Sequence, residues 1–218
     1  GGLSDGRFID EDKIPEYEAG RRQGVPITHI FKDEVEASNS APTVVLLVDT
    51  STSIGDSDKA TRLYDAVLDM GEAYMRANPN TRIAILEFGK EVRLLKGFEH
   101  AWNVENKAHF LSRLRANQSA TDDERACHEA TALLDVMGAQ TGIIHSFSDG
   151  QGMPGTEQAI QAATIKGYHY SAIGVGRACK GVLRFGDHGI YAGTVAQLAQ
   201  RFPEQARAIW EKAGKAVD

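Results

Sequence analysis

Residues 44–53 read VVLLVDTSTS, an aliphatic run that ends in an aspartate followed by alternating serines. An unbroken aliphatic run of this kind is typical of a strand buried on both faces, as in a parallel sheet. Open α/β sheets bind their ligands at the carboxyl ends of the strands. The polar end of this run therefore predicts a site where one turn brings together the side chains of Asp49, Ser51 and Ser53.

These three side chains offer only oxygen donors. Carboxylate and hydroxyl oxygens suit Mg²⁺, with Mn²⁺ as an alternative, better than they suit zinc or copper. Asp, Ser and Thr that follow a strand are also ordinary turn and helix-capping residues. The run alone leaves metal binding and capping equally open.

Downstream, stretches of strand composition alternate with segments of helical periodicity. Strands are expected at residues 82–89, 91–95, 141–148, 168–175 and 189–193, and helices from about 57 to 77, at 105–114, from about 124, at 156–165 and after Thr194. This alternation predicts an α/β fold with a doubly wound, mostly parallel sheet flanked by helices, in the Rossmann manner. The short Gly89-Lys90 turn makes 91–95 an antiparallel edge strand.

The length of 218 residues fits one large domain. Residues 1–42 are polar and weakly periodic, so we expect an N-terminal extension or docking arm there, with an edge strand near 25–31. The domain itself is expected at 43–218. Because the chain begins with Gly1-Gly2 and not Met, we expect either a cloning remnant or an internal cut from a longer protein.

Composition narrows the class of function. The formal net charge of -6 argues against a general nucleic-acid or anionic-membrane surface. No apolar run approaches the roughly 20 residues that cross a bilayer, and no signal-peptide pattern opens the chain. Cys127 and Cys179 lack metal-ligand spacing, which favours two reduced thiols in a cytosolic protein.

Three polar loops are expected on one rim of the sheet. The first carries Asp49, Ser51 and Ser53, the second Thr121 to Asp123 at a helix start, and the third Asp149-Gly150 directly after a buried strand. Each loop alone is common, because acidic loops and helix caps are frequent. Together they supply hydroxyl and carboxylate oxygens for an octahedral cation site.

The DTSTS run at 49–53, the Thr/Asp loop and the SDG run at 148–150 together resemble the metal-ion-dependent adhesion site of a von Willebrand factor A (VWA) domain. The likeness spans roughly residues 42–214, with Thr52 where the family commonly has Gly. It implies that Mg²⁺ is bound through Asp49, Ser51, Ser53, Thr121 and Asp149, the aspartates often acting through water. Asp122 is the alternative to Thr121, since the second loop aligns in two ways.

Within that family, the chain is most similar to the intracellular cobaltochelatase (CobT-type) subgroup. The features are GRFID at 6–10, the acidic helix start at 122–124 and AIGVG at 172–176. The subgroup implies a cytoplasmic subunit without catalysis of its own, working with a ring-forming AAA+ ATPase. The long acidic region expected upstream is missing from this sequence.

Three classes of function compete. The leading hypothesis is a metal-dependent protein-binding module in which a partner's Asp or Glu fills an open position on Mg²⁺. The enzyme alternative is a Mg-dependent hydrolase or phosphotransferase, but the sequence has no P-loop and no Gly-x-Ser-x-Gly elbow. His145, inside a strand, is expected to be packed and not a base. An extracellular adhesion domain is the third, which a Cys127–Cys179 disulfide would favour.

Overall fold

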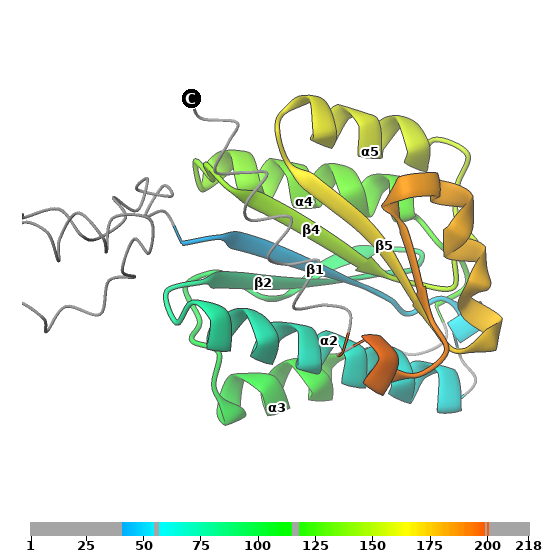
Figure 1. Cartoon of the computed structure of the whole chain (residues 1–218), viewed down its shortest axis with the longest axis horizontal. Helices are drawn as coiled ribbons and strands as arrows, with labels where there is room; N and C mark the ends of the chain where they lie inside the picture. Colours follow the sequence, from blue (N-terminus) through cyan, green and yellow to red (C-terminus); the bar gives the residue numbers. More distant parts are fainter. Residues whose placement is uncertain (1–40, 55–56, 115–117, 199, 201–218) are drawn as a thin grey trace, which may run out of the picture. The chain divides into compact units, whose positions relative to one another are not determined.

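The computed structural model describes residues 41–54, 57–114, 118–198 and 200. Its centre is a six-stranded sheet in the order β3-β2-β1-β4-β5-β6 (Figure 1). The strands are β1 (Thr43–Asp49), β2 (Arg82–Phe88), β3 (Val92–Lys96), β4 (Gly142–Phe147), β5 (His169–Val175) and β6 (Gly189–Ala192). All neighbours pair in parallel except β2 and β3, which are antiparallel. The predicted mostly parallel sheet with one antiparallel edge strand is therefore confirmed.

Helices cover both faces of this sheet (Figure 1). One layer contains α2 (Ser57–Ala77) and α3 (Val104–Arg113), and the other contains α4 (Asp123–Val136) and α5 (Thr156–Ile165). Every residue of β1 is buried. Because successive side chains of a strand point to opposite faces, Val44, Leu46 and Val48 join the core under α2, and Val45 and Leu47 join the core under α4.

This strand order places β1 at the point where the chain reverses its direction of growth across the sheet. From β1 the chain first adds β2 and β3 on one side, and then crosses over to add β4, β5 and β6 on the other. Such a switch leaves a crevice beyond the carboxyl ends of the two central strands. Asp49 ends β1, and Asp149 follows β4, so both lie at this crevice.

The segment after β5 forms a helical element that the sequence analysis did not predict. It is the 3₁₀ segment η3 (Arg177–His188), whose backbone angles are non-helical at Cys179 and at Gly186, where φ is +58°. Cys179, Val182 and Phe185 are its buried residues. Their spacing of three is that of a 3₁₀ helix, whose i and i+3 side chains share a face. A second, short 3₁₀ turn, η2 (Thr52–Ile54), follows β1.

Other expectations have mixed outcomes. Thr194 caps the last helical turn, as expected, because its hydroxyl accepts a hydrogen bond from Gln197 N at 3.2 Å. The strand expected near residues 25–31 and the end of the last helix lie outside the described residues. No helix in the described part of the chain is long and apolar enough to cross a membrane.

The His145–Tyr74 pair and the two cysteines are buried inside the fold. His145 Nε2 is hydrogen-bonded to Tyr74 Oη at 2.8 Å, and burial lowers the pKa of His145 to about 3. His145 is therefore a packed, neutral residue, as the sequence indicated. Cys127 and Cys179 are both buried free thiols, and burial raises the pKa of Cys127 to about 12.

Candidate metal site at the edge of the sheet

The turn after β1 gathers the three predicted side chains of the first loop. Asp49 Oδ1 accepts a hydrogen bond from Ser51 N at 2.8 Å, and Ser51 Oγ lies 3.0 Å from Ser53 Oγ. The second carboxylate oxygen of Asp49, Oδ2, is buried and has no hydrogen-bond partner among the described residues. A buried acceptor without a partner is costly, so this oxygen is the strongest sign that a ligand belongs here.

The electrostatics of Asp49 agree with this conclusion. Burial raises its pKa to about 7, although hydrogen bonds from Ser51 act in the opposite direction. The negative charges of Asp149 and Asp123 raise the pKa further. Asp49 therefore lies in a dry site among like charges, where a cation would stabilise its ionised form.

The third loop is joined to the first by a lysine that the sequence analysis did not single out. Asp149 is buried, and its Oδ1 accepts a hydrogen bond from Gln151 N at 3.0 Å. Lys59 Nζ, from the first turns of α2, lies 3.3 Å from Asp149 Oδ2 and also donates to the carbonyl oxygen of Ser53. The predicted meeting of these two loops is thus present in the structure.

The segment that leads into the second loop lies beside the first loop. Gln118 forms a parallel bridge with Ser51, in which Thr52 N donates to Gln118 O at 2.7 Å and Gln118 N donates to Thr50 O at 2.9 Å. Asp122 caps α4, because its Oδ1 accepts from Arg125 N at 3.1 Å. Thr121 is half-buried just before this cap. The capping bond occupies one carboxylate oxygen of Asp122, and the choice of Thr121 as a ligand remains a prediction.

Asp123 belongs to the second predicted loop but was not among the expected metal ligands. It is 5% exposed, and its Oδ1 accepts a hydrogen bond from Met153 N at 2.8 Å. Arg184, from η3, approaches its Oδ2 to 3.6 Å. The sequence held a signal, because Asp123, Ala126 and Ala130 share the buried face of α4. A carboxylate on a core-facing position needs a special partner.

Backbone contact between η3 and the third loop fixes the position of Asp149. Gly150 has φ +80°, and a Cβ built on it would lie 2.1 Å from the carbonyl carbon of Gly181. A Cβ on Gly181 would in turn lie 2.4 Å from Asp149 O. Only glycine allows two backbones to approach this closely. The backbone of η3 therefore packs directly against the backbone of the Asp149–Gly150 turn.

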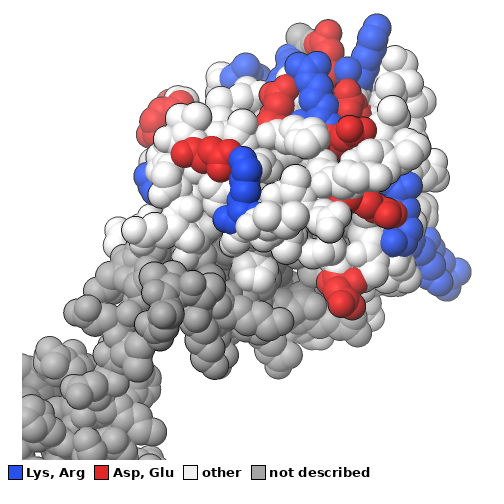
Figure 2. Space-filling model, turned by 90° about the horizontal axis from the view of Figure 1, so that it is seen from above, with Lys and Arg blue, Asp and Glu red and all other residues white. Residues whose placement is uncertain are grey.

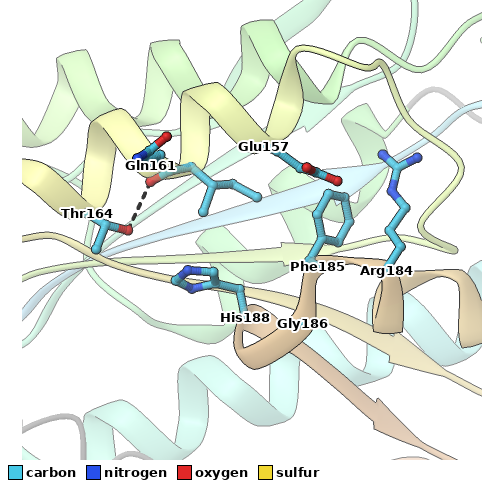
Figure 3. A pocket seen from close by; sticks show the side chains of 8 residues that line it. Glu157, Gln161, Thr164, Arg184, Phe185, Gly186 and His188 are labelled. Carbon is cyan, nitrogen blue, oxygen red and sulfur yellow. Dashed lines mark hydrogen bonds between the residues drawn. The ribbon is translucent and has the colours of Figure 1, made fainter.

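A separate hollow lies between α5 and η3 (Figure 3). Its volume is about 380 Å³, and its lining residues are Glu157, Ile160, Gln161, Thr164, Arg184, Phe185, Gly186 and His188. Glu157, Phe185 and Arg184 lie close together at one end, with His188 toward the other (Figure 3). Neither Asp49 nor Asp149 lines this hollow, so it is distinct from the rim site, and Arg184 alone belongs to both.

Exposed charges give no dominant sign on the face shown in Figure 2. Lysine and arginine side chains stand among aspartate and glutamate side chains there. Such a mixed face does not create the strong single-sign potential that draws a polyanion or polycation to a protein.

The donor set fits a hard divalent cation. Among the described residues, no group of three or more His, Cys, Asp and Glu side chains is placed to hold a metal ion. The rim instead combines one buried carboxylate oxygen with two adjacent hydroxyls. Mg²⁺ is commonly held by few protein oxygens and several waters, and this set matches that preference.

We expect the raised pKa of Asp49 to make the metal-free protein less stable as pH rises. Its folded-state pKa of about 7 exceeds the ordinary aspartate value of 3.8, so the folded chain binds more protons than the unfolded chain between these values. The free energy of unfolding should therefore fall across this window. Relative to Asp49→Asn in EDTA, the wild type should lose about 1 kcal/mol between about pH 6 and about pH 8. Urea unfolding of both proteins at each pH measures this difference, and parallel pH profiles would contradict it.

The fold and the rim define a class of protein: a doubly wound α/β domain with a cluster of buried polar side chains where its two central strands end. Residues 44–151 match the family model of the von Willebrand factor type A domain. This match, which covers 108 of the 218 residues, supports a VWA domain, and the solved structures described next share its fold.

Several solved structures share the fold. The conserved hypothetical protein BatB from Bacteroides thetaiotaomicron is 15% identical with a TM-score of 0.61, over 78% of this chain and 98% of that one. The SpRpn10 VWA domain is 14% identical with a TM-score of 0.57, over 76% and 95%. The pilus adhesin SpaC from Lactobacillus rhamnosus GG is 14% identical with a TM-score of 0.61, over 80% and 30%. These identities establish similarity of fold alone. No curated protein sequence is significantly similar to the chain.

Proposed function

We propose that this chain is a Mg²⁺-dependent protein-binding module that docks an acidic side chain of its partner. The observation that carries the proposal is the buried Oδ2 of Asp49, which lacks a partner and lies in the same turn as the Ser51 and Ser53 hydroxyls. This turn sits at the switch point of the sheet, where open α/β folds bind ligands. The residue pattern also resembles the metal-ion-dependent adhesion site of the VWA family.

Each residue of the site has a separate role in holding the cation. Asp49 supplies a charged oxygen, and the hydroxyls of Ser51, Ser53 and Thr121 supply neutral ones. Asp149, held by Gln151 N and Lys59, is suited to act through a water molecule. When bound, Mg²⁺ (or Mn²⁺) supplies an electrophilic centre that an incoming carboxylate can bind.

A count of formal charges explains why the partner's group should be an anion. The rim contains the carboxylates of Asp49, Asp123 and Asp149, and the cationic groups of Lys59 and Arg184 face the last two. The balance is one negative charge, which a divalent cation turns into one positive charge. An incoming Asp or Glu carboxylate then brings the rim to neutrality, which is favourable in a dry site.

The proposal is tested by binding with and without the ion. Immobilised protein should retain partners from native extract in Mg²⁺ and release them in EDTA. Asp49→Asn should not retain them, and Asp135→Asn should, since Asp135 is an exposed aspartate paired with Lys166. Partners retained equally in EDTA and by Asp49→Asn would overturn the proposal. A Mg²⁺-dependent phosphatase or ATPase activity that is lost in Asp49→Asn would replace it with the enzyme alternative.

For the partner itself, we propose a ring-forming AAA+ ATPase in a cobaltochelatase-like complex in the cytoplasm. The support is the resemblance of the helix start at 122–124 and of the AIGVG run to that subgroup; the third feature, at 6–10, lies outside the described residues. The described AIGVG run forms the buried end of β5 and the turn after it, where β5 packs against η3. Mass spectrometry of the proteins released by EDTA tests this identity, and the absence of any AAA+ protein among them would contradict it.

A further inference from the structure

Lys59 places a positive charge inside the rim of the candidate metal site. Its side chain is only 15% exposed, and that of its partner Asp149 is fully buried. The ammonium lies 3.3 Å from Asp149 Oδ2 and also donates to the carbonyl oxygen of Ser53. It thus connects the first and third loops of the rim, which are the two loops that a cation would also connect.

Both carboxylate oxygens of Asp149 already accept a hydrogen bond: Oδ1 from the backbone of Gln151 and Oδ2 from Lys59. Each oxygen can accept a second bond, so a metal-bound water could also bind Asp149. The competition with Lys59 therefore comes from the positive charge of the ammonium next to the same carboxylate. Arg184, the other cationic residue of the rim, does not pair with Asp149. Its partner is Asp123, at a separation of 3.6 Å.

We propose that Lys59 competes with the divalent cation for Asp149 and so weakens the metal affinity of the rim. This inference rests on the proposed function. Like charges a few ångströms apart repel strongly where water is largely excluded, so the cation must push the ammonium aside or tolerate it. In exchange, Lys59 holds the two loops together through Ser53 and Asp149 independently of the ion. The metal then acts as a reversible component of docking and not as a structural requirement of the fold.

Two variants that remove the charge test this competition. Lys59→Met removes the ammonium, and Lys59→Gln removes the charge but keeps a donor for the Ser53 carbonyl. Lys166→Met is the matched control, because it breaks a Lys–Asp pair at 2.6 Å that is exposed and lies at the end of α5. Titration calorimetry with MgCl₂ gives the Kd, and circular dichroism confirms folding.

Both Lys59 variants should bind Mg²⁺ roughly tenfold or more tightly than the wild type, while the control stays within about twofold because the distant charge is screened. Their melting temperatures should be lower than the wild type in EDTA and should rise more steeply with Mg²⁺. If either folded variant binds Mg²⁺ as weakly as the wild type or more weakly, this inference fails and the proposed function stands. If neither the wild type nor the variants bind Mg²⁺, both fail.

Discussion

Asp49→Asn should weaken Mg²⁺ binding by at least about 100-fold and still leave the protein folded. Asparagine keeps the shape of the side chain and an oxygen that can accept the Ser51 N–H, but it removes the charge. Asp49 provides the buried carboxylate oxygen beside the two hydroxyls of the rim. Without it, the cation has neutral hydroxyl oxygens and the carboxylate of Asp149, whose charge is already offset by the Lys59 ammonium.

The same substitution should raise the stability of the metal-free protein. The ionised carboxylate of Asp49 is disfavoured by burial and by its acidic neighbours. A neutral amide avoids the repulsion and costs much less to bury than a charge. Loss of binding together with a higher melting temperature in EDTA separates a damaged site from a damaged fold. Calorimetry and thermal denaturation measure the two effects, with Asp135→Asn as the control. A variant that retains wild-type Mg²⁺ affinity would contradict the assignment of Asp49.

Gly150→Ala should destabilise the protein by at least about 3 kcal/mol. The new methyl group would lie 2.1 Å from the Gly181 carbonyl carbon and 2.2 Å from Val182 N. Both are backbone atoms of a packed segment, so the clash cannot be relieved by rotating a side chain. The left-handed backbone at Gly150, with φ +80°, adds about 1 kcal/mol. The clash should push Asp149 away from the rim, so Mg²⁺ affinity should also fall.

Gly167→Ala separates the two causes of the stability loss, which are the steric clash and the left-handed backbone. Its φ of +85° imposes the same backbone penalty, but a Cβ there would have no atom within 4 Å. We therefore expect a loss of only about 1 kcal/mol for Gly167→Ala. Urea denaturation of the two variants gives the comparison, and equal losses would show that η3 does not press against the Asp149–Gly150 turn. Gly181→Ala tests the same contact from the other side and should resemble Gly150→Ala.

Much of the fold follows from patterns local in the sequence. The VVLLV run predicted a strand buried on both faces, and all seven residues of β1 are buried. The turn from β2 to β3 is short enough to enforce an antiparallel pair, which is the arrangement seen. The position of the rim loops could be predicted once the strands were known, because a parallel sheet brings the carboxyl ends of its strands to one edge.

What the sequence did not indicate depends on contacts between distant residues. Lys59 and Asp149 are 90 positions apart, and a lysine in the first turns of a helix gives no local sign of its partner. The pairing of Asp123 with Arg184 likewise requires η3 to fold back over the β4–α5 loop. The 3₁₀ segment was missed because its spacing of three residues falls between the periods of strands and α-helices.

The central claim is that Asp49, Ser51 and Ser53 hold a hard divalent cation at the β1 edge of the sheet. A crystal soaked in MnCl₂ and measured at the manganese absorption edge tests it most directly. We predict one anomalous peak within bonding distance of Asp49 Oδ2 and the two serine hydroxyls, on the side that faces Asp149. A map with no peak there, or with manganese bound only elsewhere, would contradict the account.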